Sequence, residues 1–182
     1  MNALTITGQI MGFVAMALIV LSFQFKNSRM LFALQVGSCS FFLLHYLFLG
    51  IGGDAGAFSG MAQNALGLVF RVVIMLSAKF PRLKSPVVLS IIGAAMAVLA
   101  VFTVSSGDIV ALLPVVGNFL CLGSMWTENS NVIRIAQLTV VSPTWLVYGI
   151  FRFSIAGMIV ESFNIISIAV YYIRQALVRR RG

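Results

Sequence analysis

Long apolar runs separated by short polar breaks fill almost the whole chain. The breaks, among them "KNSR", "GGDAG" and "KFPRLKSP", contain charged residues, glycine and proline, which end helices. A bilayer admits only helices or closed barrels, and a barrel strand needs about 10 residues where a helix needs about 20. The lengths of the runs therefore predict seven membrane-spanning helices: Thr5–Phe25, Met30–Ile51, Ala57–Ala78, Val87–Ser105, Ile109–Trp126, Val132–Phe151 and Ile155–Ile173.

The composition supports one all-helical membrane domain that includes residues 1–182. Of these residues, 60% are hydrophobic and 9% are charged, whereas a soluble domain carries about 25% charged residues. The first run has no preceding positive charge and is too long for a signal peptide, so we expect it to be retained as a helix. Cys39 and Cys121 both lie within apolar runs, where the expected role is that of small packing residues.

Motifs of enzymes and metal sites are not found in the sequence. The chain lacks HExxH, GxSxG and a glycine-rich phosphate loop, which carry metal, acyl-transfer and nucleotide chemistry. One histidine, two separated cysteines and four scattered acidic residues do not form a ligand pattern for a metal ion. We therefore expect no enzymatic activity, no metal and no cofactor.

The basic residues gather at one end of the predicted helices. The opposite end carries Asp54, Asp108 and Arg152. Because basic loops stay in the cytoplasm, we expect an outside N-terminus and a cytoplasmic C-terminus, with the basic tail of residues 174–182 near anionic lipid. No nucleic-acid-binding module accompanies the positive charge, so no nucleic-acid partner is expected. The residues of the basic end are Lys26, Arg29, Lys79, Arg82, Lys84, Arg134, Arg174, Arg179, Arg180 and Arg181.

The chain also matches itself at an offset of 102 residues. The segment "SFQFKNSRMLFALQVGSCSFFLLHY" aligns with "SMWTENSNVIRIAQLTVVSPTWLVY", which pairs Gln35 with Gln137 and Tyr46 with Tyr148. Chance similarity is the alternative, but polar and aromatic matches are more informative than apolar ones. The match predicts three-helix repeats at residues 5–78 and 109–173. The helix at 87–105 would then link them and restore the first orientation, which gives parallel repeats.

Two segments connect the chain to known families. The segment "TWLVYGIFRFSIAGMIVESFN" resembles the last two helices of SWEET sugar transporters, which follow a 3+1+3 plan. Through "ALLPVVG" and "GMIVES" the whole chain is more similar to the YgjV-type family of bacterial inner-membrane proteins, a group related to SWEET and PQ-loop proteins. The resemblance implies a seven-helix 3+1+3 fold in the bacterial inner membrane and transport by alternating access.

Several polar residues share one depth in the predicted helices. At about 1.5 Å rise per residue, Asn64, Trp145 and Glu161 lie about 9 to 11 Å below the outer boundary, and Asn118 lies near the middle. Agreement near the midplane is expected of a solute-binding site between repeats. The resemblance implies the same site, since it assigns solute contacts to Asn64, Trp145 and a position on the last helix. That position falls on Glu161, with Asn164 one turn deeper as the rival.

Glu161 departs from the asparagine that the resemblance implies. An asparagine suits sugar hydroxyl groups, whereas a carboxyl group near the bilayer centre costs about 2.5 to 3.5 kcal/mol when charged. We therefore expect either proton coupling through Glu161 or a solute with a positive group. His45 is a candidate proton relay, and its alternative role, which we favour, is a hydrogen bond at the outer interface. The structural alternative is a permanent pair between Glu161 and Arg71 or His45. Arg71 itself either lines the solute path or extends toward lipid headgroups.

The predicted function is a membrane transporter of a small polar solute. Pro114 and Pro143 are the candidate hinges, because proline removes a backbone hydrogen bond and permits a kink. The alternative is a non-transporting scaffold, sensor or lipid-binding protein, which a packed interior beside Asn64 and Glu161 would favour. The expected partners are the solute and the lipid bilayer, and the sequence leaves the oligomeric state open.

Overall fold

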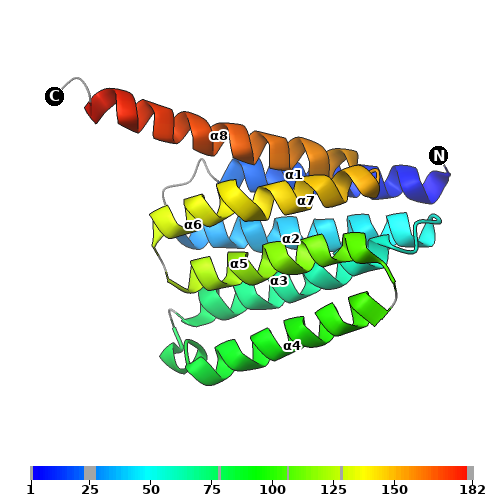
Figure 1. Cartoon of the computed structure of the whole chain (residues 1–182), viewed down its shortest axis with the longest axis horizontal. Helices are drawn as coiled ribbons and strands as arrows, with labels where there is room; N and C mark the ends of the chain where they lie inside the picture. Colours follow the sequence, from blue (N-terminus) through cyan, green and yellow to red (C-terminus); the bar gives the residue numbers. More distant parts are fainter. Residues whose placement is uncertain (1, 23–27, 78, 106, 128, 180–182) are drawn as a thin grey trace.

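The computed structural model describes residues 2–22, 28–77, 79–105, 107–127 and 129–179, and these form helices joined by short turns (Figure 1). The first half contains the α-helices α1 to α4 and the 3-10 turn η1. The second half contains α5 to α8, the 3-10 turn η2 and the π-helical turn η3. Their bounds are α1 Ala3–Ser22, α2 Ser28–Ile51, α3 Ala57–Ser77, η1 Pro81–Leu83, α4 Pro86–Ser105, η2 Ile109–Ala111, α5 Leu112–Trp126, α6 Ser130–Ala136, η3 Gln137–Val141, α7 Ser142–Phe151 and α8 Ile155–Arg179.

The prediction of an all-helical membrane domain is confirmed. Within the described residues, six helices are long and apolar enough to cross a membrane. The predicted ends at Phe25 and Ala78, and the basic residues Lys26, Arg180 and Arg181, lie outside the described residues. The last helix continues past the predicted Ile173 to Arg179, because Arg, Gln, Ala and Leu all favour helix beyond the apolar run.

The sixth predicted span, Val132–Phe151, is interrupted. Across η3 the backbone N–H of Ser142 donates to the carbonyl of Gln137, five residues back. Pro143 follows at once, and its ring would clash with the carbonyl four residues earlier in a regular helix. The wider π turn relieves this clash, and the side chain of Gln137 donates to Ser142 Oγ (2.9 Å) beside it.

Pro114 lies in a different setting from Pro143. It is in the first turn of α5, directly after the 3-10 turn η2. A helix leaves its first N–H groups without intrahelical partners, so proline costs no backbone hydrogen bond there. The change from 3-10 to α-helix occurs at this buried position.

The helices form a closed ring with one helix outside it. α1, α2 and α3 pack side by side as the first group, and α5, α6, η3, α7 and α8 form the second group. The groups meet where α3 contacts α5 and where α1 contacts α8, while α4 packs against α3 and α5 at the lower edge of Figure 1. α1, α3, α5 and α8 run in one direction, and the remaining helices run in the other.

The two ends of the ring differ in chemistry. The Arg152 end consists of the turns Gly52–Gly56, Gly107–Asp108 and Arg152–Ser154, and Asn2 joins it through a hydrogen bond from Nδ2 to Gly52 O (2.7 Å). The Arg134 end consists of Lys79–Ser85, Thr127 and the first turns of α6. Apolar side chains face outward between these ends, and on α4 Val98, Val101 and Phe102 are each about 70% exposed. Such a surface suits hydrocarbon and not water.

The ring closes through a tight contact between α1, α2 and α8. Gly12 of α1 leaves no room for a side chain, since a Cβ there would lie 2.8 Å from both Ala156 Cβ and His45 Nδ1. Gly93 of α4 has no neighbour within 4 Å of the same position. The two glycines therefore allow a matched test of the packing.

We predict that Gly12→Ala lowers the thermal unfolding midpoint in detergent, because overpacking of this kind costs about 1–3 kcal/mol. Gly93→Ala should leave the midpoint unchanged or raise it slightly, since alanine favours helix over glycine by about 0.5–1 kcal/mol. An unchanged midpoint for Gly12→Ala would contradict the close approach of α1 to α8.

Candidate functional site

A cavity of about 520 Å³ lies inside the ring and is lined by every helix of both groups, but not by α4. Its lining extends from Trp145 and Gly157 to Met125 and Arg134. Met125 is in the last turn of α5 and Arg134 is in α6, so the cavity reaches the Arg134 end. A volume of this size is typical of small-molecule sites.

All five residues predicted to contact a solute line this cavity: Asn64, Asn118, Trp145, Glu161 and Asn164. Asn64 donates to the carbonyl of Gly60 one turn earlier (2.9 Å). The rivals Glu161 and Asn164 are partners, because Asn164 Nδ2 donates to Glu161 Oε2 (3.2 Å). Helical residues three apart lie on one face, and here both face the cavity.

Two hydrogen bonds join the two groups where α3 packs against α5. Asn118 of α5 donates to Gln63 of α3, both to its side-chain Oε1 (3.0 Å) and to its backbone carbonyl (3.1 Å). Gln63 is fully buried, and among the described residues its Nε2 has no hydrogen-bond partner. Sequence reasoning missed Gln63, although an amide within an apolar helix is itself a functional signal.

Among the described residues, three charged side chains also line the cavity: Arg71 and Glu161 in its interior, and Arg134 at the Arg134 end. Arg71 is half-buried and donates from Nη1 to the carbonyl of Gly67 (3.2 Å), so it does not extend to lipid headgroups. Glu161 is half-buried as well. Within the described part of the chain, no ion pair joins Arg71 to Glu161 and no hydrogen bond joins Glu161 to His45. The permanent pair that the sequence left open is therefore absent from this conformation.

His45 instead connects three helices outside the cavity lining. Its Nδ1 lies 2.7 Å from the carbonyl of Gly8 in α1, and its Nε2 lies 2.7 Å from Ser154 Oγ before α8. A carbonyl can only accept, so Nδ1 carries the proton and Nε2 accepts from the hydroxyl group of Ser154. Both ring nitrogens are thus occupied by packing contacts.

An aromatic cluster closes the cavity toward the Arg152 end. Trp145 lines the cavity and contacts Tyr46 and Tyr148, with ring centroids 6.1 and 5.8 Å away. Tyr46 and Tyr148 are almost fully buried and contact each other at 5.6 Å between centroids. Leu49 and Ala57 complete this core. Aromatic pairs at such distances add stability beyond burial of their area.

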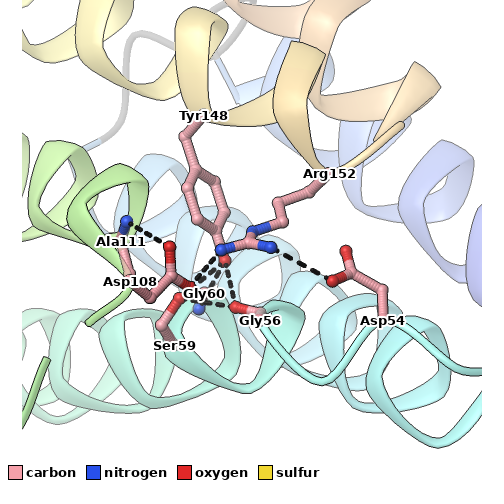
Figure 2. Close-up of polar contacts among 8 residues, drawn as sticks. All are labelled: Asp54, Gly56, Ser59, Gly60, Asp108, Ala111, Tyr148 and Arg152. Carbon is pink, nitrogen blue, oxygen red and sulfur yellow. Dashed lines mark hydrogen bonds and ion pairs between the residues drawn. The ribbon is translucent and has the colours of Figure 1, made fainter. Parts of the chain in front are cut away.

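Polar contacts behind the aromatic cluster fix the Arg152 end (Figure 2). Arg152 forms ion pairs with Asp54 (3.2 Å) and with Asp108. The hydroxyl group of Tyr148 accepts from the backbone N–H of Gly60 (2.8 Å) and donates to the carbonyl of Gly56 (3.1 Å). These contacts join the turn after α7 to the turns before α3 and α5. The sequence analysis used Arg152 and the two aspartates only as topology signals.

Gln9, which the sequence analysis did not single out, positions the turn between α7 and α8. Phe153 has a positive φ of 49°, which is uncommon for a bulky residue. Its carbonyl accepts from Gln9 Nε2 (2.7 Å). Gln9 of α1 therefore holds the α7–α8 turn in the conformation that presents Arg152.

The remaining predicted residues, Pro114 and Pro143, do not line the cavity. Pro143 follows η3, whose Gln137 and Val141 do line it, and Pro114 precedes Asn118 by one turn. Both prolines therefore lie where a bend would move cavity residues. At the Arg134 end, the Arg134 guanidinium lies 4.2 Å from the centroid of the Tyr171 ring, and both residues line the cavity.

We predict that Asn118→Leu lowers the unfolding midpoint, because it leaves Gln63 Oε1 buried without this donor at a cost of about 1–3 kcal/mol. Adding Gln63→Leu should recover part of the loss, since removing both partners of a hydrogen bond costs less than removing one. A double variant as unstable as the sum of its single variants would contradict the contact.

Comparisons with known proteins identify the family of the chain. No curated protein and no solved structure matches it significantly. A family model, Imp-YgjV, described as a bacterial inner membrane protein, matches residues 6–179. The match spans nearly the whole chain and confirms the family inferred from "ALLPVVG" and "GMIVES". The chain belongs to the Imp-YgjV family of bacterial inner membrane proteins.

Proposed function

We propose that this protein moves a small polar solute across the inner membrane by alternating access. The observation that carries the proposal is the cavity inside the ring, which holds polar and charged side chains, stops at the aromatic cluster of the Arg152 end and reaches the Arg134 end. A scaffold or sensor needs no such cavity beside Asn64 and Glu161. The polar lining favours transport, because polar groups within a membrane mark solute paths.

The proposed orientation places the Arg134 end in the cytoplasm. Lys79, Arg82, Lys84 and Arg134 lie at this end, and Arg174 lies toward the C-terminus of α8. At the other end, the only basic residue in the described turns, Arg152, is paired with two aspartates. Basic residues remain on the cytoplasmic side, so the cavity would face the cytoplasm in this conformation.

The proposed architecture is the 3+1+3 plan of SWEET transporters, with α4 as the linker between parallel repeats. Reciprocal contacts between the two groups support it. A Cβ at Gly60 would meet Tyr148, and a Cβ at Gly157 would meet Tyr46 (the hydroxyl group at 3.3 Å). Each tyrosine thus lies against the glycine that opens "GM" in the opposite group. Contacts that occur in both directions between the groups are expected of two repeats related by a two-fold axis.

Alternating access then requires a second conformation, in which the Arg152 end is open and the Arg134 end is closed. Release of Arg152 from Asp54 and Asp108 would open the outer end, while the groups approach each other at the Arg134 end. The π turn before Pro143 supplies a place to bend, since π turns are frequent at functional sites. Glu161, which lies in the cavity with Asn164 as its hydrogen-bond partner, is the proposed site of proton coupling. His45 keeps a secondary role, because its ring already joins α1 to α8.

Uptake into proteoliposomes tests the proposal. From a panel of labelled sugars, amino acids and polyamines, at least one solute should enter faster than into protein-free liposomes. Asn64→Leu should slow that entry about tenfold or more, because a lost polar contact in a binding site costs about 1–3 kcal/mol.

Asn131→Leu is the matched control, since Asn131 is exposed at the start of α6 and does not line the cavity. It should transport at the wild-type rate. If folded wild-type protein admits none of the panel, the transport proposal fails and the non-transporting alternative replaces it.

A further inference from the structure

Arg71 and Glu161 carry opposite charges into one cavity without contacting each other. The Arg71 guanidinium donates to the Gly67 carbonyl and has the Cys121 thiol as a second hydrogen-bonding neighbour, while its buried Nε has no hydrogen-bond partner among the described residues. Glu161 accepts a hydrogen bond from Asn164 and has the Ser142 hydroxyl group as a second hydrogen-bonding neighbour. The chain does pair charges elsewhere, because Arg152 binds two aspartates. Arg71 and Glu161 thus differ from Arg152 and its aspartates, because they share a cavity and form no ion pair with each other.

Unpaired charges away from water are costly, and the cost falls when an opposite charge with hydrogen-bonding groups arrives. A neutral sugar would leave both Arg71 and Glu161 without a counter-charge in direct contact. A simple cation would neutralise Glu161 alone, and a simple anion would neutralise Arg71 alone. A solute with one positive and one negative group neutralises both and keeps the cavity's net charge unchanged.

We propose that the cavity binds an amino acid in its zwitterionic form, with the carboxylate toward Arg71 and the ammonium group toward Glu161. The inference rests on the proposed transport function and names its substrate class. It also accounts for the departure of Glu161 from the asparagine expected in a sugar site.

Arg71 is suited to the carboxylate. A guanidinium group has five N–H donors and binds carboxylates with strong, directional hydrogen bonds. One of the Arg71 nitrogens is held by Gly67 O, which draws the guanidinium back along α3 by one turn, toward the level of Asn64. The free Nε2 of Gln63 is a further donor in the cavity lining.

The Glu161 side of the cavity is suited to the ammonium group. The carboxylate has two neutral hydrogen-bonding neighbours, the amide of Asn164 and the hydroxyl group of Ser142. Trp145 and Tyr46 line the same cavity with their rings 6.1 Å apart, and aromatic faces attract a cation beside a carboxylate. The remaining lining includes apolar side chains such as Phe42, Val160 and Ile168, which suit an uncharged amino-acid side chain.

Matched analogues test the charge pattern on the purified protein in nanodiscs. The probes are L-leucine and L-glutamine, the methyl ester of each, the N-acetyl derivative of each, and D-glucose. Ligand binding raises the unfolding midpoint by mass action, so titration of each probe gives an apparent Kd. A free amino acid should bind about tenfold or more tightly than its ester, which lacks the negative charge, and its N-acetyl form, which lacks the positive one.

Charge variants distinguish recognition from a structural role. Arg71→Met should weaken amino-acid binding about tenfold or more and abolish the preference over the methyl ester. Glu161→Gln should abolish the preference over the N-acetyl form. Arg82→Met, at an exposed arginine of η1 outside the cavity, should retain both preferences. A purely structural Arg71 or Glu161 would lower stability without changing which analogue binds best.

The outcomes also separate this inference from the transport proposal. Binding of D-glucose or of one singly charged analogue in preference to the free amino acids would overturn the zwitterion assignment and leave transport intact. Absence of binding by every probe, while another solute class enters proteoliposomes, would also overturn it. If no probe binds and no solute enters, both proposals are overturned.

Discussion

The ion pairs of Arg152 hold the two helix groups together at one end, and the form of the cavity depends on them. The guanidinium bridges Asp54 and Asp108 in front of a buried tyrosine pair. Removal of the arginine would leave two partly buried carboxylates without their counter-charge, which is costly. The ion pairs therefore hold the ring together at this end, and the cavity extends from the aromatic cluster to the Arg134 end.

The bilayer explains why the other polar residues face inward. Hydrocarbon offers no hydrogen-bond partner, so Gln63, Asn118, Arg71 and Glu161 gather at the cavity while apolar side chains cover the outside. Some of these side chains form hydrogen bonds with a neighbouring helix, as Asn118 of α5 does with Gln63 of α3. Arg71 and Glu161 do not pair with each other in the described structure, and a cavity with unmatched charges is suited to a ligand that supplies them.

Much of the fold and the depth of the site could be predicted from the sequence. Helix lengths follow from the bilayer thickness, and a fixed rise per residue places Asn64, Trp145 and Glu161 at one level; all three line the cavity. The rotation of each helix could not be predicted, because runs that are apolar on all sides do not indicate which face is buried. For that reason the partners of Gln9, Gln63 and Arg152 were missed. The π turn at Pro143 was missed because proline predicts a disturbance but not its form.

Side-specific labelling of a cavity cysteine tests most directly whether Arg152 closes one end of a water-filled path. Cys121 lines the cavity, and with Cys39→Ser it becomes the single thiol of the chain. In oriented membrane vesicles, a membrane-impermeant thiol reagent should reach Cys121 only from the Arg134 side in the otherwise wild-type protein, and from both sides after Arg152→Met. Equal labelling from both sides before the substitution, or no labelling from the Arg152 side after it, would contradict the account.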